Sequence, residues 1–187
     1  MVAADPAPAV TLRIVSGGQT GADRAALDFA LARGWPHGGW CPHGRRTEAS
    51  PLEARYQLRE TPSADYRQRT EWNVRDSDGT VIFSLAPRLT GGSAATAECA
   101  RHLGKPYLHL TAVTPRAACR LVEFVTTHGI KILNVAGPRA SEEPEIDGFV
   151  RRTLDEAFPA DRQSAATPAS SHQNFPDPQR HLPAAPR

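Results

Sequence analysis

Twice in this chain a short apolar run rich in β-branched residues is followed by a glycine pair and then by a stretch of helical periodicity. The first run is residues 12–15 (LRIV), before a helix expected over 22–33. The second is residues 80–83 (TVIF), before a helix expected over 93–102. Units of strand, turn and helix are typical of parallel βαβ folds, because the helix carries the chain back to start the next strand in the same direction. The pattern therefore predicts an α/β fold.

Later segments continue the alternation. Residues 106–110 (PYLHL) and 131–135 (KILNV) are expected strands, with helices over 115–128 and 145–158. We therefore predict a three-layer sandwich, with helices on both faces of a mostly parallel central sheet. Residues 36–78 break the pattern, and a long, weakly periodic stretch in a compact domain usually forms a functional surface excursion.

The length of 187 residues favours one domain with appendages, at roughly 150 residues per domain. We assign the folded domain to residues 10–158 and expect a flexible segment at 1–9. Residues 159–187 contain six prolines and few large apolar side chains, so they are expected to form a disordered tail.

Composition narrows the classes of function. Lys and Arg number 22 and Asp and Glu number 20, a net charge of +2, which is too small for an extended nucleic-acid footprint. No apolar run approaches the roughly 20 residues that span a bilayer, so we expect a cytoplasmic protein without membrane contact. The cysteines number three and form no C-x-x-C pair, which fits a reducing compartment. One short turn holding His37, Cys41 and His43 closes a tetrahedral metal site poorly, and we predict no metal ligands.

The first glycine turn, residues 16–23 (SGGQTGAD), is a candidate ligand loop. Glycines let the backbone approach a ligand, and the start of the following helix favours an anion. The alternative is structural: Thr20 caps the helix and Asp23 completes a T-x-x-D capping box. Candidate binding residues are Gly17, Gly18, Gln19, Thr20, Gly21 and Asp23.

The second glycine turn, residues 90–98 (TGGSAATAE), also leads from a strand into a helix. Two such turns in one sheet can face each other across its carboxyl edge, where ligands bind at a topological switch point. Candidate binding residues are Gly91, Gly92, Ser93 and Thr96. Glu98 is either a solvated helix residue or a candidate catalytic carboxylate in the cleft.

Within the irregular stretch, Arg45 and Arg46 lie adjacent on a glycine-flanked loop, an arrangement suited to bidentate contact with an oxyanion. A solvated arginine pair is the alternative. Asn73, in the run RTEWN, is a further candidate for the cleft.

The chain resembles the "putative molybdenum carrier" family, a branch of the LOG-like Rossmannoid (SLOG) superfamily, over about residues 12–158. The runs that carry the resemblance are GGQTGADRAALDFA, HGGWCPHGRR, QRTEWNVRDSDGTVIF and TGGSAATAECARHLGKPYLHL. It implies a Rossmann-like fold, a homo-oligomer, and binding of molybdenum, its pterin cofactor or a nucleotide-derived ligand.

Residues 90–98 also align in length with the P-G-G-x-G-T-x-x-E motif of the LOG phosphoribohydrolases, which implies a functional role for Glu98. Ala94 and Ala95 replace the Gly and Thr of that motif, so the phosphate turn lacks a flexible backbone position and a hydroxyl.

Three functions remain open at this stage. The first is a binding protein that holds an anionic ligand, such as molybdenum cofactor or a nucleotide, between the two glycine turns with help from Arg45 and Arg46. The second is a hydrolase of nucleotide glycosidic bonds that uses Glu98 as acid or base. The third is a regulatory module whose proline-rich tail recruits a partner.

Overall fold

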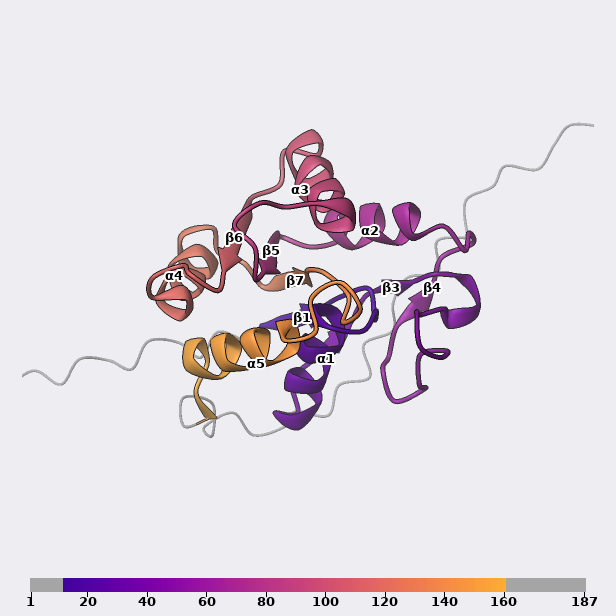
Figure 1. The fold of residues 1–187 in the computed structure, drawn as a ribbon, viewed down its shortest axis with the longest axis horizontal. Coiled ribbons are helices and arrows are strands. Elements are labelled where there is room, and N and C mark those ends of the chain that lie inside the picture. The colour runs from indigo at the N-terminus through magenta and orange to yellow at the C-terminus, as the bar shows by residue number, and fades with distance from the viewer. Residues whose placement is uncertain (1–11, 161–187) are drawn as a thin grey trace, which may run out of the picture.

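A computed structural model describes residues 12–160, which form a central parallel sheet between two layers of helices (Figure 1). The strand order is β2-β1-β7-β5-β6, and every pair of neighbours is parallel. The strands are β1 (Arg13–Val15), β2 (His37–Gly38), β5 (Gly79–Ser84), β6 (Tyr107–Thr111) and β7 (Ile132–Ala136). The predicted α/β three-layer sandwich with a mostly parallel sheet is confirmed.

The helices divide between the two faces of the sheet as the handedness of crossovers requires. The chain passes from β1 to β2 in one direction along the sheet and from β5 to β6 in the other. Since such crossovers are right-handed, their connecting helices fall on opposite faces. Figure 1 shows α2 and α3 on one side of the sheet and α1 and α5 on the other. The helices are α1 (Ala22–Ala32), α2 (Tyr66–Arg75), α3 (Gly91–His102), α4 (Ala117–Thr127) and α5 (Ile146–Ala157).

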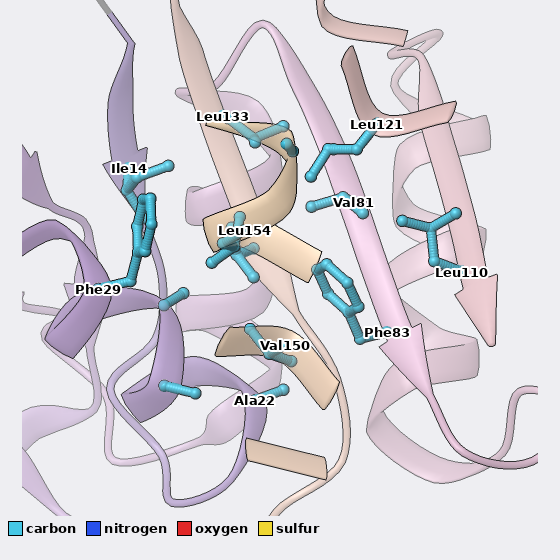
Figure 2. Packing of buried hydrophobic residues seen from close by; sticks show 14 of the residues in the cluster. Ile14, Ala22, Phe29, Val81, Phe83, Leu110, Leu121, Leu133, Val150 and Leu154 are labelled. Atoms are coloured by element: carbon cyan, nitrogen blue, oxygen red, sulfur yellow. The ribbon is translucent and has the colours of Figure 1, made fainter. Parts of the chain in front are cut away.

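The main hydrophobic core lies between the sheet and helices α1, α4 and α5 (Figure 2). Val81 and Phe83 are two residues apart on β5, so both side chains point into this core. Phe83 packs edge-on against Phe149 of α5. Ile14, like Val81 and Phe83, is fully buried. Burial of each such side chain stabilises the fold by about 1.5–3 kcal/mol. Because β7 is the last strand yet lies between β1 and β5, this core joins both halves of the chain.

The eight predicted strands and helices all occur, with bounds shifted by one or two residues, but the stretch over 36–78 holds elements that periodicity did not reveal. It contains α2, β2, a two-stranded sheet of β3 (Trp40–Cys41) and β4 (Arg59–Glu60), and the short 3-10 helix η1 (His43–Arg45). A second core cluster, built around Cys41 and Tyr56, packs this excursion onto Leu27 of α1. The excursion is therefore part of the folded domain.

Two predictions about the ends of the chain fall mainly outside the structure. The segment 1–9 and, apart from Pro159 and Ala160, the tail 159–187 lie beyond the described residues. Within residues 12–160, every helix is too short or too polar to cross a membrane.

Candidate functional site

A groove of about 650 Å³ opens at the carboxyl edge of the sheet, on the side covered by α2 and α3. Its walls come from the loop after β1, the start of α1, the helices α2 and α3, and the loop after β7. Since the chain leaves β1 and β5 in opposite directions, this edge is the topological switch point, where ligands of open α/β sheets bind. The lining residues are Gln19, Asp23, Tyr66, Arg67, Arg69, Thr70, Glu71, Gly92, Ser93, Ala95, Thr96, Glu98, Cys99, His102, Leu103, Ala136, Gly137, Arg139 and Glu142.

Of the first glycine turn, only Gln19 and Asp23 line the groove, and the backbone of the turn is tightly packed. Gly18 and Gly21 adopt positive φ angles of 76° and 74°, which side chains disfavour. A Cβ on Gly21 would lie 2.7 Å from the carbonyl oxygen of Pro138, in the loop after β7. Ser16 donates to the Val135 carbonyl at 2.8 Å. The glycines therefore let two loops pack closely.

The structural alternative for this turn, a T-x-x-D capping box, is wrong. The N-cap of α1 is Gly21, which makes no side-chain cap. Thr20 instead donates its hydroxyl to the Glu48 carboxylate and accepts the Ala140 N–H at 3.2 Å. Asp23 turns toward the loop and accepts the Gln19 N–H at 3.2 Å. Both side chains serve the tertiary packing of the loop rather than the helix end.

A buried ion pair joins the loop to α2. The Arg69 Nη1 lies 2.8 Å from the Asp23 Oδ2, and the side chains are only 15% and 3% exposed. The guanidinium passes directly over Gly17, where an added Cβ would lie 1.4 Å from Nη1. The Arg69 Nε is buried without a hydrogen-bond partner among the described residues. Gly17 therefore makes room for an arginine at the groove, rather than for the ligand itself.

Sequence reasoning did not select Arg69, although it lines the groove. Arg69 is the first residue of the run RTEWN, in which only Asn73 was selected as a candidate. Its functional position depends on α2 and on a contact with Asp23, 46 residues away in the chain. No local signal reports such a contact.

Helix α3 begins at the second glycine turn, beside the groove. Gly92 and Ser93 line it, whereas Gly91 is exposed beside it with a φ of 50°. The N-cap Thr90 makes no side-chain hydrogen bond to the helix end, so the first N–H groups of α3 receive no side-chain cap. Thr96 lines the groove but donates its hydroxyl to the Gly92 carbonyl at 2.8 Å. This helix end can bind an anion through its N–H groups and dipole.

Charged side chains surround the rest of the groove. Arg67 and Arg139 add positive charge, and Glu71, Glu98 and Glu142 add negative charge. Arg139 is held by Glu142 at 3.0 Å. Glu98 is exposed and lies about two turns into α3, so its carboxylate is available to a ligand. The groove thus offers both cationic contacts and carboxylate acceptors.

The carboxylate of Glu48 links the loop after β1 to the loop after β7. It accepts hydrogen bonds from Thr20 in the loop after β1 and from Ser141 in the loop after β7. Partial burial raises the pKa of Glu48, but the hydrogen bonds from Ser141 and Thr20, with the charge of Arg139, outweigh it and lower the pKa below its ordinary value. Ionised Glu48 therefore stabilises the contact between the two loops.

The two loop arginines lie outside the groove, contrary to their predicted role as an oxyanion clamp. Arg45 donates to the carbonyls of Leu52, Glu53, Tyr56 and Leu58 at 2.8–3.2 Å. A guanidinium with this many carbonyl partners organises the excursion and has little left for a ligand. Arg46 is exposed and does not line the groove.

Asn73 is also structural rather than part of the groove. Its side-chain oxygen accepts the Trp40 N–H at 2.9 Å, and its side-chain nitrogen donates to the Trp40 carbonyl at 2.9 Å. This pair of bonds fastens β3 to α2. This role could not be predicted, because Asn73 and Trp40 both lie in residues 36–78, which have no clear periodicity.

The donor set of the described residues does not suit a bare metal ion. Among residues 12–160, no three His, Cys, Asp or Glu side chains come together as metal ligands would. Cys99 lines the groove, but burial, with a contribution from Glu71, raises the pKa of its thiol. Burial likewise raises the pKa of Cys41. Neither thiol has the thiolate character of a reactive nucleophile.

Together, the sheet order and the groove define a Rossmann-like α/β domain with a ligand-sized cleft at the carboxyl edge. The chain belongs to the circularly permutated YpsA SLOG family, whose model matches residues 14–158. A similar solved structure is that of "Putative molybdenum carrier protein" from Syntrophus aciditrophicus SB, with 46% sequence identity and a TM-score of 0.77. The match covers 81% of this chain and 96% of that one. No curated protein matches the chain. The resemblance inferred from the sequence is therefore confirmed.

Proposed function

We propose that the groove binds an anionic small molecule of the nucleotide or molybdopterin type, and that the protein is a carrier or binding protein for it. The observation that carries the proposal is the N-terminus of α3 at a groove of about 650 Å³. That volume lies in the range of small-molecule and cofactor sites, about 300–1,000 Å³. A helix of 12 residues supplies both N–H donors and a favourable dipole for an anion.

Four charged residues of the groove have roles in this proposal: Asp23, Arg67, Arg69 and Glu98. The anionic end of the ligand contacts Gly92 and Ser93, with Arg67 at the rim. Asp23 does not repel it, because Arg69 compensates its charge at 2.8 Å. The exposed carboxylate of Glu98 accepts hydrogen bonds from ligand hydroxyl or amino groups.

Molybdenum enters the proposal through the name of the structural relative. Since no three metal-ligating side chains come together in residues 12–160, molybdenum would be recognised as an oxyanion or as a pterin complex. The groove's N–H and guanidinium donors fit either species.

The test is calorimetric titration of the purified full chain with AMP, sodium molybdate and a phosphorylated pterin. Gly92→Asp places a carboxylate at the start of α3, and a Cβ there meets no atom within 4 Å. We expect affinity for at least one probe, weakened about tenfold or more by Gly92→Asp because the new charge repels the anion. The matched control is Gly148→Asp, in the first turn of α5 and outside the groove. Unchanged affinity in Gly92→Asp, or no affinity for any probe, would overturn the proposal.

A second candidate is a hydrolase of nucleotide glycosidic bonds. The observation that favours it is Glu98 itself, exposed on α3 and lining the same groove as the helix end. It would act as acid or base while the phosphate binds at Gly92. Release of adenine from AMP, followed by chromatography, tests this function. Glu98→Gln should abolish the release, and Glu123→Gln, an exposed substitution on α4, should not.

We further propose that the protein forms a homo-oligomer. Leu103, Tyr107 and Val113 are large apolar residues with 37%, 36% and 75% of their surface exposed. Light scattering of the full chain checks this expectation, and a monomer at all concentrations would contradict it.

Recruitment of a partner by the proline-rich tail concerns residues outside the described part of the chain.

A further inference from the structure

The groove follows helix α3 along its whole length. Gly92 and Ser93 line it at the start of the helix, and His102 and Leu103 line it at the end. At about 1.5 Å per residue, Gly92 and His102 lie about 15 Å apart along the helix axis. The anion proposed above needs only the first of these ends, so the other end contacts a different part of the ligand.

Glu71 brings an acidic side chain to the second half of the groove. Helix α2, which carries it, packs against α3 (Figure 1). Burial raises the pKa of the Cys99 thiol and the charge of Glu71 raises it further, so Glu71 lies near Cys99. Cys99 is about 10 Å beyond Gly92 along the helix axis. An extended nucleotide holds its phosphate at a similar distance from the outer edge of its base.

The carboxylate of Glu71 is available to a ligand. It is exposed, lines the groove, and makes no hydrogen bond or ion pair within residues 12–160. Two arginines lie one turn away from it on α2. Arg67 forms no ion pair with Glu71. Arg75 feels the charge of Glu71, but its guanidinium is held by two hydrogen bonds to Asp76, at 2.6 and 2.9 Å.

The other groups along α3 leave the far end of the groove to a ring. Side chains on a helix lean toward its N-terminus, so the carboxylate of Glu98 comes nearer the anion end than its position suggests. Glu98 therefore suits the middle of the ligand. Leu103, with 37% of its surface exposed, adds an apolar wall at the far end. An apolar wall and a carboxylate together suit a flat heterocycle with N–H donors on its edge.

The chemistry of a carboxylate selects among such heterocycles. An ionised carboxylate only accepts hydrogen bonds, and its two oxygens best match two adjacent N–H donors. Guanine and pterin both present this pair, a ring N–H beside an amino group, on a 2-amino-4-oxopyrimidine ring. Adenine and cytosine place an acceptor nitrogen beside the amino group, and uracil places carbonyls on both sides of its N–H. In these three bases, a lone pair would face the carboxylate and oppose binding.

We propose that Glu71 determines the specificity of the groove and selects a ligand with a 2-amino-4-oxopyrimidine ring, either a guanine nucleotide or a phosphorylated pterin. This inference rests on the proposed function, because the anion at the start of α3 sets the position of the ring. The ring packs against Leu103, and its two N–H donors bind the two oxygens of Glu71.

The test is calorimetric titration of the full chain with GMP, IMP, AMP and a phosphorylated pterin. We expect GMP, the pterin or both to bind at least about tenfold more tightly than AMP, because charge-assisted hydrogen bonds are lost with adenine. IMP, which lacks only the amino group of guanine, should bind more weakly than GMP. Tight binding of GMP alone would identify a nucleotide, and tight binding of the pterin alone would identify a pterin.

Variants then assign the preference to Glu71. Glu71→Gln is an exposed substitution of equal size that replaces one acceptor with a donor. It should weaken GMP or pterin binding about tenfold or more and leave AMP binding within about twofold, so that the preference disappears. Glu98→Gln should instead weaken GMP and AMP equally, because both carry the same sugar. Glu123→Gln, exposed on α4 and outside the groove, is the matched control.

Two results would overturn this inference and leave the proposed function standing. One is AMP binding as tightly as GMP and the pterin, and the other is a preference that survives Glu71→Gln. Absence of binding for all four compounds and for molybdate would instead overturn the proposed function, and this inference with it.

Discussion

The two glycine turns have similar sequences and lie at the same edge of the sheet, but their surroundings differ. In the first turn a Cβ on Gly21 would lie within 3 Å of backbone atoms from the loop after β7, and a Cβ on Gly17 would overlap Arg69. In the second turn, a Cβ on Gly91 or Gly92 meets no atom within 4 Å. The first turn is a packed joint between loops, and the second is an open helix end.

This difference separates two uses of glycine that a sequence pattern cannot distinguish. At Gly17 and Gly21 the missing side chain makes room for the protein's own atoms. At Gly92 it leaves the approach to the helix end open for a ligand. Ligand contacts should therefore be sought first at α3, with the first turn acting as the scaffold that positions Arg69.

The largest expected effect comes from breaking the buried ion pair of the packed turn. Arg69→Met leaves Asp23 charged and buried, and we expect a loss of about 3–5 kcal/mol in the free energy of unfolding. Urea unfolding followed by circular dichroism measures it. The double variant Arg69→Met with Asp23→Asn should recover part of the loss, because Asn still accepts the Gln19 N–H without a buried charge. A double variant no more stable than Arg69→Met would show that the pair is not the cause.

A somewhat smaller loss is expected from Gly21→Ala. The residue has a φ of 74°, and the added methyl would lie 2.7–2.9 Å from three backbone atoms that cannot move independently. Strain and overpacking together should cost about 2–4 kcal/mol, measured by the same unfolding titration. Gly34→Ala is the control, since its φ is also positive, at 63°, but no atom lies near. Equal losses in the two variants would remove the packing argument and leave only backbone strain.

A smaller, pH-dependent effect is expected at the rim of the packed turn. The pKa of Glu48 is lowered in the folded protein, so its contribution to stability is fully present above the unfolded carboxyl pKa of about 4.3 and is lost as the pH falls through the lower, folded value. Glu48→Gln should therefore melt at a lower temperature than the parent at pH 7, and the difference should disappear in acid. Thermal melts between pH 7 and pH 3 check this, with Glu123→Gln as the control. A difference independent of pH would contradict the role of the ionised carboxylate.

Much of the fold could be predicted because its signals are local. The run at residues 80–83 is apolar because β5 is buried along its whole length, and Gly104 follows α3 as a helix stop. Helix α2 was missed because only Asn73 and Val74 among its ten residues are buried, which leaves no apolar stripe. Its one local signal was Asp65, whose side chain accepts the Arg67 N–H at 2.9 Å as an N-cap.

The site was predicted less completely, because its decisive contacts are distant in the sequence. The glycine turns and Glu98 could be selected from their positions next to strands and helices. The adjacency of Arg45 and Arg46 suggested a clamp, but the four carbonyls that bind Arg45 come from a loop whose path the sequence does not reveal. Arg69 was missed for the converse reason, since α2 brings it to Gly17 and Asp23.

The smallest effect sharpens the contrast between the turns. Gly92→Ala adds a methyl where a Cβ meets no atom within 4 Å, at a position without positive φ. Because alanine loses less backbone entropy than glycine in a helix, we expect unchanged or slightly raised stability, by about 0.5–1 kcal/mol at most. The substitution keeps the backbone N–H, so ligand affinity should stay within about threefold of the parent, in contrast to Gly92→Asp. If calorimetry instead shows that Gly92→Ala binds as poorly as Gly92→Asp, the ligand needs the space of the missing side chain, and the two glycine turns differ less than their packing indicates.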